Sequence, residues 1–472
     1  MKKILTSALA FSLALGGLAA VDTQKTEAAN NSYVRLAGKD RLATAIEIAK
    51  KGWSTGLTHA EKSVILARSD NPVDALSAAS LAGVKDAPIL LTNSGSVDER
   101  VLAEIKRLGT KKVYVLGSAS VVSDSIIATL KSKGLVVERV AGPTRFETAQ
   151  KINEKAGTSK STKAIVVNGD TVVDALSAIS ESANNNIPIY LTKTNRLPVA
   201  LPTTVKEVVI YGSANVVSND IQSQLTKQGK KVTRVAGPDR FSTNVAALKA
   251  SKFAFKNTIL VRGTSVKTDA EDYPDAVASA GLADKLDAKI VLTHPTNTNQ
   301  IIKSYLSSNT LPTYVLGSPV AVTDSVLSGL GYNVPITKSN FAKSLLLEGK
   351  LPTLDVAIGA TTNEVINKLG KSVMIDQNDE EEYLFYDYEN FSISFDYATK
   401  KVDYISTYDN KISMTEAELE SLLGSPEEFY EEDGLKTVWY EVGDYSFNAD
   451  INMDTKKVEY MDVSSFIEYI EE

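Results

Sequence analysis

The 472-residue sequence contains no cysteine and only two histidines. The lack of cysteine excludes a disulfide framework, a thiolate zinc site, a cysteine nucleophile and a lipid-modified N-terminal cysteine. His59 and His294 stand far apart and are expected to be surface residues of loops. Because neither HExxH nor GxSxG occurs, a zinc hydrolase is poorly supported. Neither GxGxxG nor GxxxxGK[ST] is present, so nucleotide binding has no positive support. We expect no cofactor and no metal.

Arginine is absent after Arg262, and the charge of the chain divides near this point. Residues 30–334 hold 37 lysines and arginines against 26 aspartates and glutamates, a net charge of +11. Residues 335–472 hold 11 against 30, a net charge of −19. Net charge governs association rather than fold, so a basic body and an acidic tail are expected to have different partners.

The N-terminus lacks a run long enough for a clear membrane span. Lys2 and Lys3 precede an apolar stretch from 4 to about 21 that is interrupted by serines and glycines, and small residues end near Ala29. This pattern predicts a cleaved signal peptide over 1–29, with a membrane anchor as the other interpretation. We therefore expect a secreted protein with no transmembrane segment after cleavage.

One short motif occurs three times, as RLAGKDRL at 35–42, RVAGPTRF at 139–146 and RVAGPDRF at 234–241. Each copy holds two arginines six positions apart around an Ala-Gly turn, and a threonine follows three residues after the second arginine. Three copies about a hundred residues apart predict three similar modules.

Three further landmarks recur in the same order. They are VDALSA at 73–78 and 173–178 with YPDAVASA at 273–280, then PILLT at 88–92, PIYLT at 188–192 and KIVLT at 289–293, then VYVLGS at 113–118, VVIYGS at 208–213 and TYVLGS at 313–318. Four landmarks repeated three times in one order cannot reasonably arise by chance.

The three blocks resemble the second class of cell-wall-binding repeats, found in secreted proteins of Gram-positive bacteria, over about 33–334. The resemblance implies three modules of a Rossmann-like or Toprim-like α/β fold around a pseudo-three-fold axis. It also implies non-covalent docking on an anionic cell-wall polymer. We place the repeats at 33–134, 135–229 and 230–334.

The first repeat alternates short apolar strands with helices. Strands are expected at 63–67, 89–91 and 112–116, and helices at 73–82, 97–108 and 123–132. Such alternation predicts a parallel sheet covered on both faces, hence a small doubly wound α/β unit. Residues 135–140 lead directly into the next arginine motif. A closed triangular arrangement, with each motif beside the neighbouring module, would explain why no fourth motif follows the third repeat.

The tail contains a second type of repeat. After a linker at 335–353 with a short helix at 341–347, TNEVINKLG at 362–370 corresponds to TEAELESLLG at 415–424, and TKKVDY at 399–404 to TKKVEY at 455–460. Each copy predicts a helix ending at a glycine and then an antiparallel meander, with strands at 383–386, 391–395 and 402–405. This acidic α+β domain, placed at 354–472, resembles the β-lactamase-inhibitor-protein-like class.

The second arginine of each motif is the first candidate for ligand contact, namely Arg41, Arg145 and Arg240. A guanidinium presents a planar fork of donors that matches phosphate or carboxylate. The alternative is that each arginine pairs with an acidic neighbour across a module junction. The first arginines, Arg35, Arg139 and Arg234, lie in predicted strands and are expected to form structural salt bridges.

The Gly-Ser pairs are the second candidate for anion contact, through Ser118, Ser213 and Ser318. Each follows a strand and precedes a helix, where backbone N–H groups face outward in a parallel sheet. The alternative is a tight strand-to-helix turn. Asp74, Asp174 and Asp275 are expected at helix starts, where they complement the helix dipole. Because no second acid recurs at fixed spacing in all three copies, we reject a metal site there.

The tail holds 11 of the 19 tyrosines and two acidic runs, at 380–382 and 427–433. Neither run has the order of an EF-hand loop, so a solvated acidic face is expected. Phe391, Ile393 and Phe395 alternate as in a half-buried sheet, and a tyrosine-rich outer face could bind protein or glycan.

The favoured function is a secreted, wall-associated and non-catalytic anchor that displays an acidic interaction domain. Its expected partners are an anionic wall polymer and a secreted protein bound by the tail, and no nucleic-acid partner is expected. Two alternatives stay open. In the first, the chain would modify the cell wall as an enzyme or would modify the activity of a wall hydrolase. In the second, it would be a secreted protein inhibitor that acts through its tail.

Overall fold

The computed structural model describes residues 32–70, 73–171, 173–264, 273–369, 374–377, 383–388, 391–396, 398–408 and 411–465. The signal peptide predicted over 1–29 and the acidic run at 380–382 lie outside these residues. Within them, every helix is too short or too polar to cross a bilayer.

The first repeat is a four-stranded parallel sheet in the order β3-β2-β4-β5. Its strands are β2 (Ser63–Arg68), β3 (Ile89–Thr92), β4 (Lys112–Leu116) and β5 (Val136–Val140), and its helices are α2 (Arg41–Gly52), α3 (Val73–Leu76), α4 (Ala79–Val84), α5 (Glu99–Arg107) and α6 (Asp124–Ser132). The expected strands and the parallel sheet are confirmed.

Two expected helices of the first repeat differ in detail. The continuous helix predicted over 73–82 is wrong, because the backbone at Ala78 (φ −82°, ψ 0°) leaves the helical region and separates α3 from α4. Helix α5 begins at Glu99 rather than at 97. Asp98 ends the extended segment there, since its carboxylate accepts the backbone N–H of Arg100.

The other two repeats have the same architecture. The second sheet has the order β7-β6-β8-β9, and the third has the order β11-β10-β12-β1. The second repeat contains α7 (Arg145–Ala156), the 3₁₀ turn η2 (Thr158–Lys160), β6 (Lys163–Asn168), α8 (Val173–Asn185), β7 (Ile189–Thr192), β8 (Glu207–Tyr211), α9 (Asn219–Lys227) and β9 (Lys231–Val235). The third contains α10 (Arg240–Ala250), β10 (Asn257–Arg262), α11 (Pro274–Lys285), β11 (Ala288–Thr293), α12 (Gln300–Ser307), β12 (Thr313–Leu316) and α13 (Asp324–Gly329).

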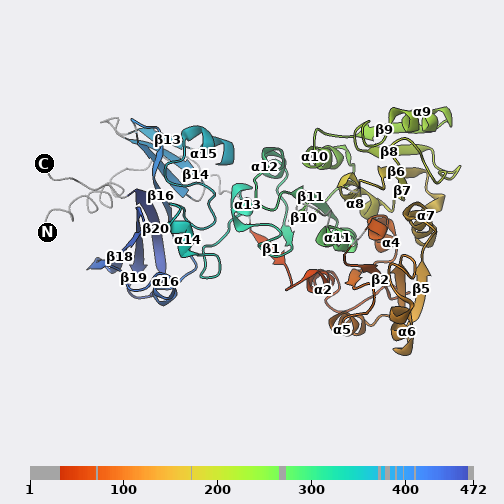
Figure 1. The fold of residues 1–472 in the computed structure, drawn as a ribbon, viewed down its shortest axis with the longest axis horizontal. Coiled ribbons are helices and arrows are strands. Elements are labelled where there is room, and N and C mark those ends of the chain that lie inside the picture. The colour runs from red at the N-terminus through yellow and green to blue at the C-terminus, as the bar shows by residue number, and fades with distance from the viewer. Residues whose placement is uncertain are drawn as a thin grey trace. The chain divides into compact units, whose positions relative to one another are not determined.

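The first strand of the chain completes the third sheet. β1 (Tyr33–Leu36) pairs in parallel with β12, in the place that β5 takes beside β4 and β9 takes beside β8. Each strand that contains the first arginine of a motif therefore belongs to the sheet of one repeat, while the following helix begins the next repeat (Figure 1). The hypothesis that each motif lies beside a neighbouring module agrees with this pairing.

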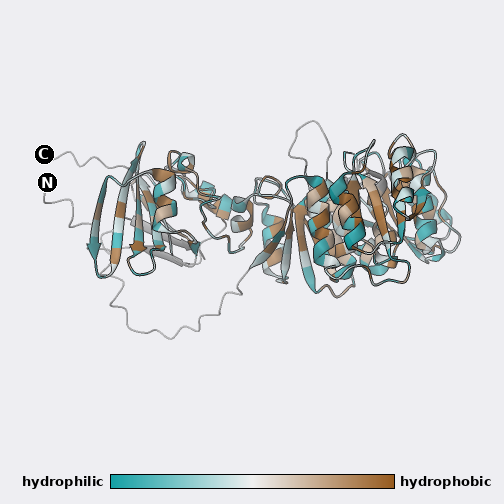
Figure 2. Ribbon diagram, turned by 90° about the horizontal axis from the view of Figure 1, so that it is seen from below, coloured by the Kyte–Doolittle hydropathy of each residue, from teal (hydrophilic) through white to brown (hydrophobic). Residues whose placement is uncertain are grey.

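The alanine-rich helices α4, α8 and α11 pack against one another in all three pairs. Small residues permit this close approach: a Cβ atom at Gly83 would lie 2.4 Å from the carbonyl oxygen of Ala183, and one at Gly281 would lie 2.3 Å from that of Ala87. One hydrophobic core extends through all three repeats, and Figure 2 shows apolar residues along their strands and helices. The repeats therefore form one packed body.

The C-terminal part has its own hydrophobic core and one antiparallel eight-stranded sheet, in the order β13-β14-β15-β16-β20-β19-β18-β17. Its elements are α14 (Lys343–Leu346), α15 (Thr362–Leu369), β13 (Met374–Gln377), β14 (Tyr383–Tyr388), β15 (Phe391–Asp396), β16 (Val402–Tyr408), α16 (Glu416–Leu423), β17 (Glu428–Glu432), β18 (Leu435–Val442), β19 (Tyr445–Asn452) and β20 (Val458–Ser465). The two predicted helix-plus-meander copies are confirmed, and they join where β16 pairs with β20.

Several local predictions for this part can be compared directly. Phe391, Ile393 and Phe395 are buried, as their alternation indicated. Gly424 ends α16 at φ 93°, whereas Gly370 lies outside the described residues. The short helix expected at 341–347 is α14, and the segment predicted as a linker supplies side chains to the second core, namely Ile336, Phe341, Leu346 and Leu351.

Candidate functional site

The first arginine of each motif binds the end of the neighbouring strand. Its guanidinium donates to the carbonyl oxygen of the glycine in a Gly-Ser pair, over 3.0 Å for Arg35 to Gly317, 2.7 Å for Arg139 to Gly117 and 2.8 Å for Arg234 to Gly212. These contacts fix the carboxyl edge of each sheet.

The expected salt bridges form in two repeats. Arg35 pairs with Asp324 at 2.9 Å and Arg139 pairs with Asp124 at 2.7 Å. In the second repeat Arg234 donates to Gln222 over 3.2 Å instead. One terminal nitrogen of Arg234 is buried without a hydrogen-bond partner, and burial lowers the pKa of this guanidinium. The first arginines therefore have a structural role, and its strength differs among the repeats.

The second arginine of each motif is the first residue of a helix and reaches the end of a central strand. Arg41 in α2 donates to the carbonyl of Ser69 over 2.7 Å, Arg145 in α7 to Gly169 over 2.6 Å, and Arg240 in α10 to Gly263 over 2.8 Å. All three side chains are partly buried. The backbone contact holds one nitrogen and so orients the guanidinium at the carboxyl edge of its own repeat.

Arg145 and Arg240 differ in their further contacts. The Arg145 side chain keeps 37% of its surface exposed and lies 3.9 Å from Asp170. Arg240 donates to the phenol oxygen of Tyr273 over 2.9 Å. Long-range electrostatic contacts with acids are therefore present at two of these arginines, with Asp170 for Arg145 and with Asp174 of the preceding repeat for Arg240.

The recurring threonine closes the turn between the two arginines. Thr44, Thr148 and Thr243 each accept the backbone N–H of the motif glycine over 3.0–3.1 Å. A Cβ atom at Gly142 would lie 2.5 Å from the Cβ atom of Glu147, so the glycine is required by space. The sequence showed the threonine in every copy, but its partner depends on the folded turn.

The Gly-Ser pairs lie at the same edge as the second arginines, because β4 pairs in parallel with β2, β8 with β6, and β12 with β10. Gly117, Gly212 and Gly317 have φ values of 92°, 109° and 97°. The serine carbonyls accept backbone N–H groups three and four residues ahead, which builds a tight turn. The side chains of Ser118, Ser213 and Ser318 are partly exposed. The structure thus brings the two candidate groups of each repeat to one edge.

The aspartates at the helix starts lie beneath these turns. A Cβ atom at Gly212 would lie 2.7 Å from a carboxylate oxygen of Asp174, and one at Gly317 would lie 2.8 Å from Asp275. Burial raises the pKa of Asp174, while Arg240 and a hydrogen bond from Thr243 act against this rise. Asp275 lies 4.0 Å from Arg262. Both side chains face the interior rather than acting as exposed helix caps, and the side chain of Asp74 lies outside the described residues.

The residue that follows the last threonine of β7 and of β11 differs between the second and third repeats, and the sequence analysis did not single it out. Lys193 lies with its ammonium 5.9 Å from the ring of Phe146, and His294 lies 6.4 Å from the ring of Phe241. Burial and the nearby Arg240 lower the pKa of His294. The second repeat therefore places an added cation beside its candidate arginine, which the third does not at neutral pH.

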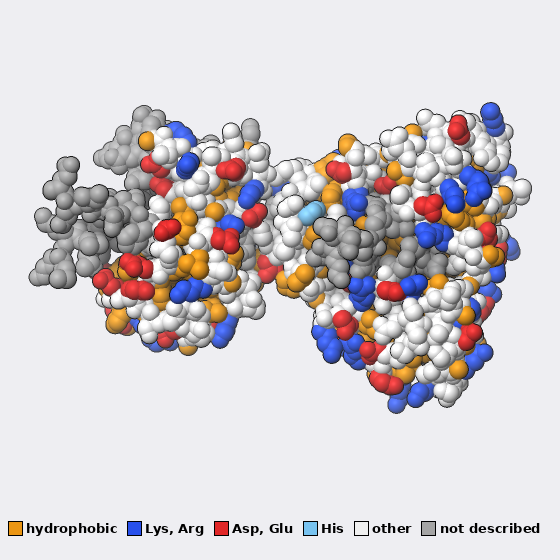
Figure 3. Space-filling model, in the orientation of Figure 1, with side chains coloured by type: hydrophobic (Ala, Val, Ile, Leu, Met, Phe, Trp, Pro, Cys, Tyr) orange, Lys and Arg blue, Asp and Glu red, His pale blue; other side chains and the backbone are white. Residues whose placement is uncertain are grey.

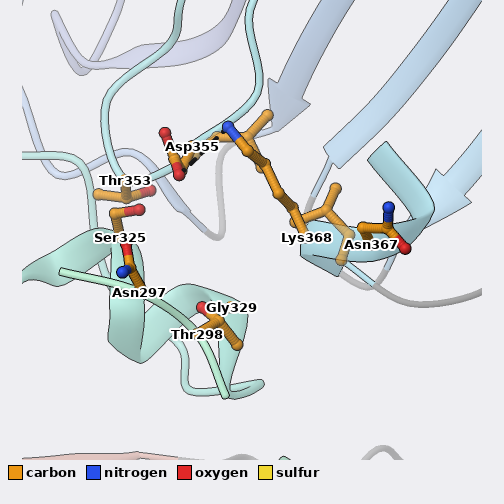
Figure 4. Close-up of a pocket in the computed structure, with 10 residues that line it drawn as sticks. Asn297, Thr298, Ser325, Gly329, Thr353, Asp355, Asn367 and Lys368 are labelled. Carbon is orange, nitrogen blue, oxygen red and sulfur yellow. Dashed lines mark ion pairs between the residues drawn. The ribbon is translucent and has the colours of Figure 1, made fainter. Parts of the chain in front are cut away.

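Other features of the described residues do not suggest a catalytic centre. They contain no group of three or more histidines, aspartates and glutamates placed to hold a metal ion. A cavity of about 210 Å³ is lined by Asn297, Ser325, Thr353, Asp355 and Lys368, with an ion pair of 3.3 Å between Lys368 and Asp355 (Figure 4). Figure 3 shows lysine and arginine side chains gathered over the repeats.

Two family models match the chain. Cell wall binding domain 2 matches 35–127, 139–222 and 234–327, and a domain of unknown function, DUF4309, matches 340–464. These matches confirm the three repeats expected from the arginine motif and show that such repeats indicate cell wall binding. The resemblance of the tail to the β-lactamase-inhibitor class finds no support in these matches.

Known proteins resemble the repeat region. N-acetylmuramoyl-L-alanine amidase LytC of Bacillus subtilis is 28% identical over 311 residues, covering 65% of this chain and 59% of its own length. The amidase enhancer of the same organism is 27% identical over 343 residues, covering 72% and 44%. The solved structure of Cwp8 from Clostridium difficile is 29% identical, with a TM-score of 0.57 over 64% of this chain and 51% of its own.

The chain thus spans well under two thirds of the length of these relatives. The model of cell wall binding domain 2 matches more than half of the 472 residues. Together with the tripled arginine motif and its common geometry, this places the chain in the family of proteins that carry cell wall binding domain 2.

Proposed function

We propose that the protein anchors itself non-covalently to an anionic polymer of a Gram-positive cell wall through its three repeats. The observation that carries this proposal is the common position of Arg41, Arg145 and Arg240. Each donates a hydrogen bond to a backbone carbonyl at the carboxyl edge of its sheet, and each side chain is only partly buried there. Guanidinium groups held in this way suit phosphate or carboxylate groups of a polymer.

Repetition gives these sites their strength. A single charge-assisted hydrogen bond contributes about 1.5–3 kcal/mol, which is too little for stable retention. Three sites on one body that face a repeating polymer gain by effective concentration, with an increase in avidity on the order of 10²–10⁴. The net charge of +11 over 30–334 supports the same kind of partner. In this proposal Ser118, Ser213 and Ser318 add contacts beside the arginines.

The remaining parts complete the proposal. The signal peptide at 1–29 directs the chain out of the cell. The three repeats are Rossmann-like or Toprim-like units around a pseudo-three-fold axis. The acidic domain at 354–472, whose sheet has a β-lactamase-inhibitor-like pattern, contacts a secreted protein. No catalytic role is assigned to any of these parts.

The test compares retention of the full chain on purified walls before and after removal of their anionic polymers. The key variant carries Arg41→Gln, Arg145→Gln and Arg240→Gln, since glutamine keeps a donor for the backbone carbonyl but loses the charge. The matched control carries Lys131→Gln, Lys227→Gln and Lys249→Gln, in the last turns of α6, α9 and α10 and thus near the opposite edge of the sheets.

We expect the arginine variant to lose retention at least about tenfold at low salt, with less than about twofold loss for the lysine variant. Retention that survives removal of the polymers, or equal losses in the two variants, would show that these arginines are not the binding groups.

A second candidate function is modification of a wall hydrolase. It is favoured by the similarity to an amidase and to a protein named amidase enhancer. Digestion of walls by an N-acetylmuramoyl-L-alanine amidase would be followed with and without the full chain. An unchanged rate on walls that retain the protein would exclude this function and leave the anchor intact.

A further inference from the structure

The C-terminal sheet has one face without any described cation. Strand register places its side chains in rows that cross the sheet. The middle row contains Ser392, Ser406, Asp462, Asn448, Trp439 and Glu428. The row on one side of it contains Tyr408, Tyr460, Asp450, Thr437 and Tyr430. The row on the other side contains Ser394, Tyr404, Ser464, Ser446 and Glu441. We call these side chains the polar face.

The other face of the same strands is the core side. Val438, Ala449 and Met461 alternate with polar-face residues and are buried in the second core. A solvated antiparallel sheet usually carries polar residues of both signs on its outer face. The polar face instead holds four tyrosines, a tryptophan and four carboxylates, and the register puts no lysine or arginine in its three rows. The described side chains of the polar face therefore carry negative charge only.

Two of these carboxylates are held away from water without a cation. Asp462 is only 6% exposed and accepts a hydrogen bond from the amide of Asn448 over 2.9 Å. Asp450 accepts from the hydroxyl of Thr437 over 2.7 Å. No ion pair in the described part of the sheet involves either residue. A buried carboxylate with only neutral partners is costly, and an approaching cation would offset this cost.

The aromatic residues of the polar face can also bind a cationic side chain of a partner. Tyr408 is 48% exposed and its ring lies 5.7 Å from that of Tyr460, whose hydroxyl is hydrogen-bonded to the hydroxyl of Tyr404. Lysine and arginine side chains bind over such rings, and tyrosine, tryptophan and arginine are enriched at the centres of protein interfaces.

We propose that the polar face is the docking surface for a basic protein, whose lysine and arginine side chains lie over Tyr408 and Tyr460 and pair with Asp450 and Glu441. The net charge of −19 over 335–472 favours a cationic partner over an anionic polymer. The described residues offer no group of acids that could hold a metal ion, so the cation belongs to the partner. This inference deepens the proposed role of the acidic domain and is independent of how the repeats bind the wall.

The experiment uses the full chain with cytochrome c as a basic, folded probe and fully acetylated cytochrome c as its neutralised match. Two variants change the polar face: Glu441→Lys and Tyr408→Ala. Their controls make the same kind of change on the core side of the edge strand, where Glu431 is exposed and Phe429 is 60% exposed: Glu431→Lys and Phe429→Ala. Circular dichroism verifies that each variant folds.

We expect binding of cytochrome c at low salt and a loss of at least about tenfold on acetylation. The polar-face variants should each weaken binding by about tenfold, against less than about twofold for the controls. Equal effects of both pairs would overturn the proposal, as would binding of soluble wall glycan in place of the basic probe. Retention on walls is measured in parallel, and its loss in the arginine variant alone separates failure of the anchor from failure of this surface.

Discussion

Gly142 lies where the chain turns from the first arginine of the motif to the helix that begins at the second. A Cβ atom there would lie 2.5 Å from the Cβ atom of Glu147 and 2.6 Å from its backbone carbon. We expect Gly142→Ala to lower the free energy of unfolding by about 1–3 kcal/mol, because the backbone must shift to admit the methyl group. Denaturant unfolding measures the change.

The matched control for this substitution is Gly95→Ala, since nothing lies within 4 Å of a Cβ atom at that position. Its effect should stay within about 0.5 kcal/mol. A similar loss in both variants would mean that the cost comes from the glycine backbone and not from crowding in the motif.

Asp462 makes the stability of the C-terminal sheet depend on pH. Burial raises the pKa of this carboxyl to about 7, from an ordinary value of 3.8, so the folded state holds a proton that the unfolded chain releases. The resulting stabilisation is full below about pH 3.8 and is lost as the pH rises through about 7. Asp462→Asn mimics the neutral acid, and at pH 8.5 it should stabilise the sheet by about 1–3 kcal/mol.

Hydrogen exchange of the β19 and β20 amides measures this change, after correction for the pH dependence of the intrinsic exchange rate. At pH 5 the stabilisation by Asp462→Asn should be clearly smaller than at pH 8.5, and Glu441→Gln, which changes an exposed carboxyl of the same face, should have little effect at either pH. A stabilisation by Asp462→Asn that is equal at both pH values would contradict the linkage.

The sequence indicated which residues matter at the carboxyl edges better than it indicated how deeply they are buried. The arginine positions and the first-arginine salt bridges followed from spacing and charge, and two of those bridges are present. The burial of Asp174 and Asp275 could not be predicted, because it depends on a Gly-Ser turn about forty residues away that the parallel sheet brings above them. Whether the second arginines and the serines bind a polymer stays a prediction.

Among the elements, β1 depends most on a distant partner. Arg35 in β1 donates to the carbonyls of Gly317 and Val322, each over 3.0 Å, and pairs with Asp324. We expect Arg35→Met to cost about 1.5–3 kcal/mol, because it removes charged hydrogen bonds and leaves Asp324 unpaired. Faster hydrogen exchange in β12 would report the loss.

Arg234→Met provides the comparison within the same fold. Arg234 has no carboxylate partner and carries a buried nitrogen without a hydrogen bond, so its replacement should cost less than about 1 kcal/mol. If both substitutions destabilised their repeats equally, the carboxylate would not be the source of the difference.

Elements were predictable where the local pattern was strong. Continuous apolar runs gave β2, β3 and β4, and the alternation of Phe391, Ile393 and Phe395 gave β15. The break between α3 and α4 at Ala78 was not predicted, because the alanine-rich stretch favours a continuous helix; both short helices pack against α7 and α8. The rows of the polar face likewise require the register of strands that are distant in sequence.

On the scale of the whole repeat body, α4, α8 and α11 link all three repeats into one core. Gly281→Ala would place a methyl group 2.3 Å from the carbonyl oxygen of Ala87, at the junction of the third and first repeats. Because the core is shared, we expect a loss of about 1–3 kcal/mol that accelerates hydrogen exchange in β2, β6 and β10 together. Exchange that rises in β2 and β10 but not in β6 would show that the repeats unfold separately.

The pairing of β1 with β12 joins residues about 280 positions apart in the chain. A ribosome that adds 5–20 residues per second needs roughly 15–60 seconds between making the one strand and making the other. During that interval β12 has not been synthesised, so β1 has no partner strand. β1 therefore pairs later than strands whose partners lie nearby in the sequence. The sheet of the third repeat can therefore be completed only after nearly the whole repeat region has been synthesised.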